Sequence, residues 1–490
     1  MKTTNRFSIH FAATQLSAGF LIRTLLYVAV TAQFAAPAHA NNFRLGPLID
    51  LSDPDALAAC GTTGNEKECS LAVNPANPKN IVAAWIGGSF KGIGTAVTLD
   101  GGKKWQQVVI PGLTVCTGGT LGFAVDPWLS FAPNGDLYHV CGAGAGLLGD
   151  IIVSKSSDGG LHWNSQVSVD GNTDPRFTLD KPSLTADSTD SHYVYAVWEQ
   201  AANGNRRFLK FARTTDVGVT WEPARQILDL GNSDQVAGPQ ILVMPDGTLV
   251  CLFLDLLFSN GNGGGQKEEA ILAVIRSTDK GQTWSTPIQG PHESIFQATD
   301  PDTGFPYVNQ NGYPPLFSAA VDSRNGNLYV VFEDTRFSGG LYNDIAFTMS
   351  TDGGSTWSAP IPINKTPTNI APGNRQAFIP TVAVAANGTI GVAYYDFRFN
   401  DSNPGLPTDY WLVHCHPSAA TPATNPANWG NEVRLTDRSF DMEMAANPSG
   451  EAYWVGDYEG LASVGNDFLA TWSQPYGVDH DSIFFRRAGP

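Results

Sequence analysis

Short apolar segments alternate with turn residues along almost the whole chain. A typical unit opens with an apolar segment, passes through a Pro/Asn/Asp-Gly turn, and continues into a segment rich in Val, Tyr and Trp. Leu184–Ala186 with Tyr193–Trp198, and Ala319–Val321 with Leu328–Phe332, are two such pairs. Two more apolar segments complete each unit, and no helical pattern intervenes. The pattern predicts an all-β protein built from four-stranded units.

An eight-residue motif of the form Ser/Thr-x-Asp-x-Gly-x-x-Trp recurs five times, between the third and fourth segments of a unit. The Asp can close a turn by accepting hydrogen bonds from nearby backbone N–H groups, and the Gly can take a positive φ. The Trp can pack between adjacent sheets. We therefore expect the motif to be structural rather than catalytic. Its aspartates are Asp100, Asp158, Asp216, Asp279 and Asp352.

Two further units, at 381–429 and 442–485, lack the motif, which brings the count to seven. Repeating four-stranded units predict a β-propeller of seven blades, or of six if the final unit is partly loop. The last unit stops after its third strand. The N-terminal segment Phe43–Ile49 is expected to supply the missing strand and so to protect both edges.

The first forty residues are predicted to be an export signal. Lys2, Arg6 and Arg23 precede an apolar run at 24–34, and Ala38-His39-Ala40 supplies a small-x-small cleavage site. The run is far shorter than the roughly 20 residues that span a bilayer. Residues 41–490 then form a single domain that is secreted or periplasmic. The net charge of −17 argues against nucleic acid or an anionic membrane as the main partner, and we expect a monomer.

Six cysteines are present, and export permits disulfides. Cys60 is expected to pair with Cys69, and Cys116 with Cys141. Two cysteines in apolar strands, Cys251 and Cys415, are expected to be buried free thiols. No cysteine or histidine spacing indicates zinc, and we expect no cofactor. The alternative is a calcium or sodium ion held by Asp126 and Asp180 in the central channel, because hard oxygen ligands suit such ions.

Ionisable residues concentrate on one predicted face, where first strands start and second strands end. The long insertions 259–269, 289–315 and 399–408 open there too, and loops over a rigid scaffold often bind ligands. The alternative is that Asp334 with Arg336, and Asp396 with Arg398, are ion pairs that tie blade to blade. The face carries Glu68, Asp126, Asp180, Lys181, Asp441 and Glu443 at strand starts, and Glu199, Asp334, Arg336, Asp396, Arg398, Asp457, Tyr458 and Glu459 at strand ends.

The five motifs resemble the Asp-box (BNR) repeats of the sialidase-like propellers. Sialidases use an arginine triad, an Asp acid/base and a Tyr nucleophile activated by a Glu. The resemblance implies these roles in the same order along the chain, with a third arginine unassigned because only Phe43-Arg44-Leu45-Gly46 is comparable to the family's Phe/Tyr-Arg-Ile-Pro motif. The implied catalytic residues are Asp126, Glu199, Asp396, Asp457 and Tyr458, and the implied substrate contacts are Asp180, Lys181, Asp334, Arg336 and Arg398.

The resulting expectation is a sialidase-like glycoside hydrolase that acts on an acidic glycan. One alternative is a polysaccharide lyase, in which Arg336 or Arg398 neutralises a uronate carboxylate while Tyr458 moves a proton. Another is a non-catalytic propeller that binds glycan or protein through exposed aromatic residues such as Tyr307 and Tyr313.

Overall fold

The computed structural model describes most of the chain after the predicted signal peptide. The predicted signal peptide itself lies outside the described residues. Among the described residues, no helix has the length and apolar character needed to cross a bilayer. The described residues are 43–60, 64–146, 149–164, 166–172, 174, 176–202, 206–231, 234–258, 267–294, 298–305, 308, 316–445 and 453–490.

Strands dominate the described residues, as the alternation of apolar segments and turns predicts. They fall into groups of consecutive strands. The first three groups are β3–β6 (Lys67–Val73, Ile81–Gly87, Gly92–Thr98, Gln106–Val109), β7–β10 (Phe123–Phe131, Leu137–Gly144, Asp150–Ser156, Val167–Gly171) and β11–β14 (Thr178–Ala186, Val194–Ala202, Arg206–Thr214, Arg225–Leu228). The next three are β15–β18 (Asp234–Val243, Leu249–Phe258, Lys267–Ser277, Ile288–Glu293), β19–β22 (Ser318–Val321, Leu328–Asp334, Asp344–Ser350, Ile361–Pro362) and β23–β26 (Ala377–Val384, Ile390–Asp396, Pro407–Cys415, Trp429–Arg434). The last contains β28–β30 (Gly460–Val464, Asp467–Tyr476, Asp479–Gly489).

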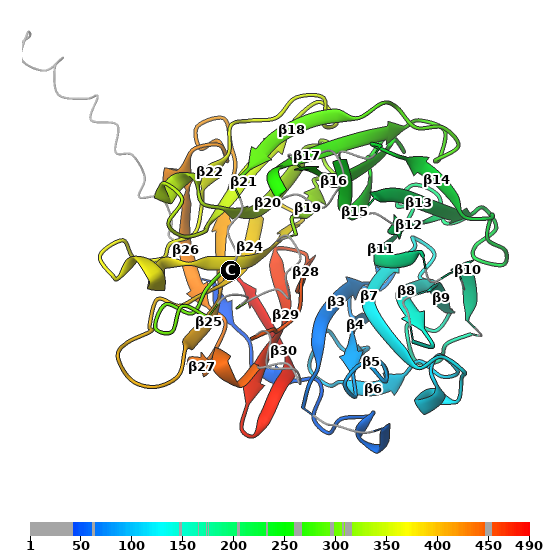
Figure 1. The fold of residues 1–490 in the computed structure, drawn as a ribbon, viewed down its shortest axis with the longest axis horizontal. Coiled ribbons are helices and arrows are strands. Elements are labelled where there is room, and N and C mark those ends of the chain that lie inside the picture. The colour runs from blue at the N-terminus through cyan, green and yellow to red at the C-terminus, as the bar shows by residue number, and fades with distance from the viewer. Residues whose placement is uncertain are drawn as a thin grey trace, which may run out of the picture. The chain divides into compact units, whose positions relative to one another are not determined.

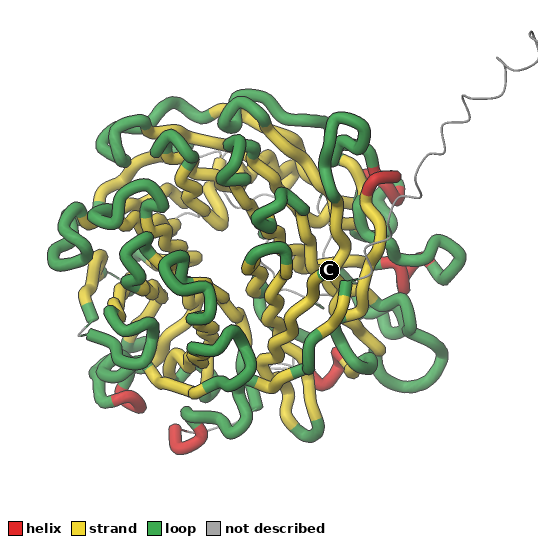
Figure 2. Tube along the Cα trace, turned by 180° about the vertical axis from the view of Figure 1, so that it is seen from behind, coloured by secondary structure: helices red, strands yellow, loops and turns green. Residues whose placement is uncertain are grey.

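Helical structure among the described residues is limited to short 3₁₀ turns. Those visible in Figure 2 lie at the outer rim, away from the innermost strands. They are η1 (Ala58–Cys60), η2 (Val115–Thr117), η3 (Arg336–Ser338), η4 (Pro372–Arg375), η5 (Pro426–Asn428) and η6 (Met442–Ala445).

Within each group the strands pair antiparallel with their sequence neighbours, and the groups follow one another around a common centre (Figure 1). A single parallel pairing of Arg207 with Gln235 joins the third and fourth groups into one eight-stranded sheet. The first strands contact each other in the order β3, β7, β11, β15, β19, β23 and β28, and β28 also contacts β3. This arrangement places the starts of all first strands near one another.

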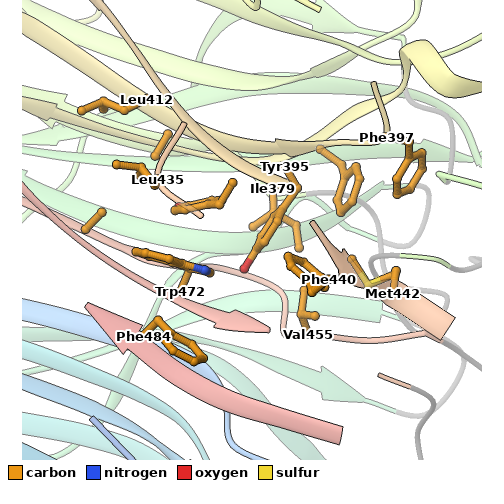
Figure 3. Packing of buried hydrophobic residues seen from close by; sticks show 14 of the residues in the cluster. Ile379, Tyr395, Phe397, Leu412, Leu435, Phe440, Met442, Val455, Trp472 and Phe484 are labelled. Carbon is orange, nitrogen blue, oxygen red and sulfur yellow. The ribbon is translucent and has the colours of Figure 1, made fainter. Parts of the chain in front are cut away.

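The N-terminal segment completes the last group, as predicted. Both β1 (Arg44–Leu45) and β2 (Ile49–Asp50) pair antiparallel with β30. Phe43 stacks on His414 with the ring centroids 3.9 Å apart. Beside it lies a large apolar cluster in which Tyr395, Phe440 and Trp472 pack between the last two groups (Figure 3). The short strand β27 (Phe440–Asp441) pairs with β25 at this seam.

All five copies of the repeated motif form the predicted turn between the third and fourth strands. In one copy the Asp279 carboxylate accepts hydrogen bonds from the Ser277 hydroxyl at 2.7 Å and from the Thr283 backbone N–H at 2.9 Å. The aspartates of the other copies make equivalent bonds. The motif glycines take positive φ values, from 79° at Gly218 to 98° at Gly160. The motif is therefore a structural turn.

Replacing Asp279 with Ala should lower the free energy of unfolding by about 1–2 kcal/mol, because three local hydrogen bonds to one carboxylate are lost at the surface. The midpoint of urea unfolding, compared with that of the wild type, measures this change. Asp401→Ala, which alters an exposed loop carboxylate, is the control. Equal midpoints for the two variants would show that the carboxylate does not stabilise the turn.

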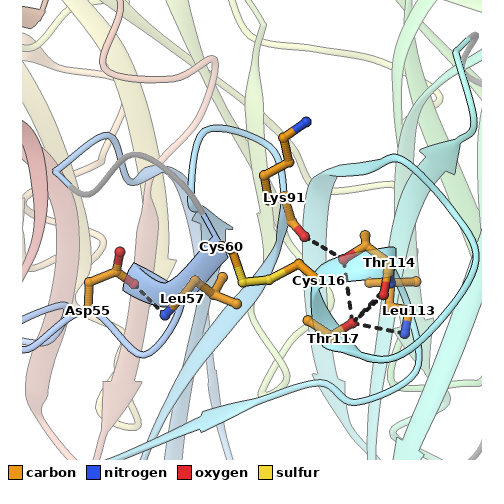
Figure 4. The surroundings of a disulfide bond; sticks show 8 residues. All are labelled: Asp55, Leu57, Cys60, Lys91, Leu113, Thr114, Cys116 and Thr117. Atoms are coloured by element: carbon orange, nitrogen blue, oxygen red, sulfur yellow. Dashed lines mark hydrogen bonds between the residues drawn. A yellow bond between two sulfur atoms is a disulfide. The ribbon is translucent and has the colours of Figure 1, made fainter.

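The predicted cysteine pairing is wrong. The disulfide joins Cys60 to Cys116, whose Cα atoms are 5.5 Å apart (Figure 4). These two cysteines belong to the 3₁₀ turns η1 and η2, which meet outside the sheets. Cys69 and Cys141 are free and buried, because they lie within strands β3 and β8 and face the apolar clusters. The expectation that Cys251 and Cys415 are buried free thiols is confirmed.

Candidate functional site

Five of the innermost strands contain a β-bulge near their starts, and each bulge holds a residue at positive φ. The values are 54° at Glu68, 53° at Asp126 and 49° at Lys181, with Gly238 and Ile379 at the equivalent positions. Positive φ is uncommon for residues other than glycine, and such strained positions concentrate at functional sites. A bulge also redirects a side chain. Three adjacent bulges thereby turn ionisable groups toward one another.

Lys181 lies at the centre of these groups. Its ammonium nitrogen is 2.5 Å from an Asp457 carboxylate oxygen and 3.1 Å from one of Asp126. It is also 3.8 Å from Glu68 and 4.0 Å from Asp180. The side chains of Glu68, Asp126 and Asp457 are only 2–6 % exposed. We call Glu68, Asp126, Asp180, Lys181, Asp457 and Tyr458 the Lys181 cluster.

Burial sets the protonation of the cluster. It raises the pKa of Glu68 well above the usual range, and the neighbouring Asp126 charge raises it further. Burial also raises the pKa of Asp126 to about 6, although the Lys181 ammonium opposes the shift. Burial alone would lower the pKa of Lys181, but Asp126 and Asp457 outweigh it and raise that pKa. At neutral pH a protonated Glu68 therefore donates a hydrogen bond to an ionised Asp126, beside a charged lysine.

Tyr458 borders the cluster. Its hydroxyl donates to the Pro127 carbonyl at 3.2 Å, and its ring centroid is 5.5 Å from that of Trp128. Burial raises the pKa of Tyr458 well above its usual value, and the Glu68 and Asp126 carboxyls add to the effect. The phenol is therefore protonated at neutral pH in this structure.

Glu199, which the resemblance assigns to the activation of Tyr458, has other partners. One oxygen accepts from Arg207 at 2.5 Å, and the other accepts from the Gly238 backbone N–H at 3.2 Å. Arg207 also lies 3.6 Å from Asp180. Glu199 and Arg207 thus form an outer layer that reaches the Lys181 cluster through Asp180.

The two arginines expected to bind a substrate carboxylate are both paired with acidic side chains. Arg336 is 2.7 Å from the buried Asp334 and donates to the His292 carbonyl of the preceding group. Arg398 is 2.6 Å from the buried Asp396 and 2.5 Å from Glu432. Its guanidinium also lies 3.7 Å from the centre of the Trp411 ring.

Among the interactions described for these two arginines, none reaches the Lys181 cluster. Asp396 in turn accepts from Thr366, in the connection from the preceding group. Both arginine–aspartate pairs thus contact the neighbouring group, one through the His292 carbonyl and the other through Thr366.

Asp126 and Asp180 are the residues predicted from the sequence as an alternative site for a calcium or sodium ion. Within the described part of the chain, no three His, Cys, Asp or Glu residues are arranged to hold a metal ion. The positive charge that a calcium or sodium ion would bring to Asp126 and Asp180 is supplied by the Lys181 ammonium.

Two hollows in the described part of the molecule differ in their distance from the Lys181 cluster. One, of about 800 Å³, lies at the outer seam beside β27 and β30 and includes Asp441. A smaller one of about 220 Å³ begins at Trp128, which packs on Tyr458, and follows the inner strands. This smaller hollow is linked to the cluster through the contact between the Trp128 and Tyr458 rings. Tyr307 and Tyr313, expected to be exposed binding residues, lie outside the described residues.

Several residues of the site were given no role from the sequence. Glu68 was placed on the correct face without a function, and Arg207 and Trp454 were not singled out. The Trp454 indole N–H donates to Asp457 at 2.8 Å. A usable signal is present, because a proline follows four of the five bulge residues: Asp126-Pro127, Lys181-Pro182, Gly238-Pro239 and Ile379-Pro380.

No protein-family model matches the chain, and no curated protein matches it. Similar solved structures include a protein of unknown function from Dyadobacter fermentans, with a TM-score of 0.47 and 12% identity over 91% of this chain and 99% of that one. A Hadza microbial sialidase has a TM-score of 0.45 and 15% identity over 85% of this chain and 74% of its own. An α-L-arabinanase from Penicillium chrysogenum has a TM-score of 0.45 and 14% identity, over 72% and 94%. Structures similar to this chain thus include sialidase-like propellers, at a distance that assigns no activity.

Proposed function

We propose that the chain is an exported glycoside hydrolase whose reaction takes place at the Lys181 cluster, on a closed propeller of seven four-stranded blades. The observation that carries the proposal is the buried pair of Glu68 and Asp126 beside the Lys181 ammonium, in which burial raises the pKa of Glu68 well above its usual range and that of Asp126 to about 6. Glycoside hydrolysis commonly uses two carboxyl groups whose environments hold them in different protonation states. The contact cycle from β3 through β28 and back to β3 supports the closed ring.

Each residue of the pair has a definite task in this proposal. Glu68 donates its proton to the leaving oxygen as the glycosidic bond breaks. Water attacks the anomeric carbon and gives its proton to ionised Asp126, which afterwards returns a proton to Glu68. Lys181 keeps Asp126 and Asp457 ionised in a buried setting. Tyr458 positions the sugar beside Trp128, at the end of the smaller hollow. We give it this task because its protonated hydroxyl is a hydrogen-bond donor rather than a ready nucleophile.

The charges of the site support an uncharged glycan over the acidic one expected from the resemblance. Four carboxyl groups surround the single ammonium of Lys181. Arg336 and Arg398 are already paired with carboxylates. An anionic sugar would have to approach acidic groups without an unpaired cation to receive it.

The test is an assay of the purified protein on arabinans, other neutral polysaccharides, sialosides and uronate-containing polysaccharides. Release of reducing ends reports hydrolysis, and absorbance of unsaturated products reports elimination. Tyr458→Phe should retain measurable hydrolysis if Tyr458 positions the sugar, and should abolish it if the phenol is the nucleophile. Activity only on uronates with unsaturated products would replace the hydrolase with a lyase, and no turnover on any substrate would overturn the proposal.

The pH dependence of kcat/KM should show an acidic limb near pH 6. Asp126, with its pKa raised to about 6 by burial, must be ionised to act as the base. Below that pH the rate should fall about tenfold for each further unit, because protonated Asp126 can no longer take the proton of the attacking water. A profile that stays flat down to pH 5 would show that the ionisation of Asp126 does not govern turnover.

A further inference from the structure

A further hollow lies at the opposite ends of the strands from the Lys181 cluster. Its volume is about 600 Å³, and it lies between the β7–β10 and β11–β14 groups. Tyr138, near the start of β8, and Lys155, near the end of β9, form one side. The third copy of the repeated turn forms the other, with Val217 and Trp221. We call it the Trp221 hollow.

Two buried polar groups that line the Trp221 hollow have no hydrogen-bond partner. Within the described part of the chain, the Tyr138 hydroxyl and the Ser154 hydroxyl are both buried without one. The indole N–H of Trp163, which also lines the hollow, is likewise buried without a hydrogen-bond partner. It is not specific to the hollow, because the indole N–H groups of Trp105 and Trp284 in other copies of the turn are unpaired too. The two hydroxyls therefore carry the inference. Native proteins rarely leave buried hydroxyls unpaired, so each calls for an explanation.

The turn beside the hollow is strained in one copy of the motif. Val217 has a φ of 64° at a position where three other copies have glycine and the fourth has Lys280. A β-branched residue is a genuine outlier in this region, and such strain concentrates at functional sites. The Val217 carbonyl accepts a hydrogen bond from the Lys155 ammonium at 2.8 Å. Two residues further on, Val219 leaves 78% of its surface exposed at the hollow.

From these observations we propose that the Trp221 hollow is a second, non-catalytic site, which binds a sugar unit of a neutral glycan. Trp221, which is half-buried at the hollow, offers an aromatic face to the apolar side of a sugar ring. The Tyr138 and Ser154 hydroxyls can each donate to and accept from sugar hydroxyls, which would satisfy both groups. The Lys155 ammonium is paired with Asp136 at 2.8 Å, so it is not an open site for an anion. The site requires no turnover and does not depend on the proposed hydrolase.

Calorimetric titration with arabinotetraose, xylotetraose, cellotetraose and galactotetraose up to about 10 mM tests the site. The wild type and Asp126→Asn should bind at least one of these probes equally well. Trp221→Ala should weaken that binding at least tenfold, because it removes an aromatic face. Trp284→Ala, which changes the same position in the next copy of the turn, is the matched control and should leave the affinity unchanged.

Tyr138→Phe separates ligand binding from folding. Removing an unpaired buried hydroxyl should leave the urea midpoint unchanged or higher, while sugar affinity falls about tenfold. Equal affinities for wild type, Trp221→Ala and Tyr138→Phe would overturn the inference, as would the absence of binding by all four probes. Binding that Asp126→Asn abolishes and Trp221→Ala leaves intact would place the sugar at the Lys181 cluster and overturn it too.

Discussion

Asp126→Asn is expected to lower kcat by about 10²–10⁴-fold on whichever glycan the wild type hydrolyses. Asp126 is the acceptor of the Glu68 hydrogen bond, and its charge helps to hold the pKa of Glu68 well above the usual range. The neutral amide removes both effects and cannot take the proton of the attacking water, so the base of the reaction is lost. Glu68→Gln should cause a loss of similar size because the proton donor itself is gone. Steady-state kinetics at pH 7 measures both variants.

Asp187→Asn is a closely matched control for this experiment. Like Asp126, Asp187 is a buried carboxylate paired with a lysine, and its distance to the Lys280 ammonium is 2.7 Å. It lies just after the far end of β11, away from the cluster, and also accepts from the Tyr195 hydroxyl. This variant should keep kcat within about twofold while it loses stability. If Asp187→Asn and Asp126→Asn lose activity equally, the loss reflects weakened folding, and Asp126 has no catalytic task.

The strands and the repeated turns could be predicted because their determinants are local. A turn such as Ser277–Trp284 contains every donor and acceptor it needs within eight residues, and the apolar periodicity of a strand shows directly which segments are buried. The pairing of the N-terminal segment with β30 could be predicted because the last unit lacks a fourth strand of its own. In these cases the chemistry that stabilises the element can be identified from neighbouring residues alone.

The site was only partly predictable, because its contacts join residues that are distant in the chain. Asp126, Asp180, Lys181 and Asp457 were correctly placed on one face, and the structure brings them together. Which carboxylate each cation meets depends on bulges and loop paths that the strand pattern does not encode.

Arg398 illustrates this limit. Its ion pair with Asp396 was one of the two interpretations of the segment, but its contacts with Glu432 of β26 and Trp411 of β25 could not be inferred from Asp396-Phe-Arg398. The same limit explains why the predicted cysteine pairing was wrong, since Cys60 and Cys116 are 56 residues apart in the chain and meet between two loops.

Lys181→Met should lower the free energy of unfolding by about 3–5 kcal/mol at pH 7.5, because it leaves Asp126 and Asp457 buried without their counter-charge. The effect should shrink as the pH falls. In the folded protein the pKa of Asp126 is about 6, whereas its ordinary value is 3.8. Loss of the Lys181 ammonium raises the pKa in the folded protein further. Between these values the folded state binds more protons than the unfolded state, so acidification stabilises the variant.

Urea unfolding at pH 7.5 and pH 5 measures both parts of this prediction, with Lys181→Arg as the control that retains the charge. The arginine variant should lose less stability than the methionine variant at pH 7.5, because a guanidinium still faces the carboxylates. The gap between the two variants should then narrow at pH 5, where protonation neutralises part of the cluster. A methionine variant as stable as the wild type at pH 7.5 would mean that the carboxylates are largely protonated there. In that case the protonated–ionised pair assigned to Glu68 and Asp126 would not exist at the pH of the reaction.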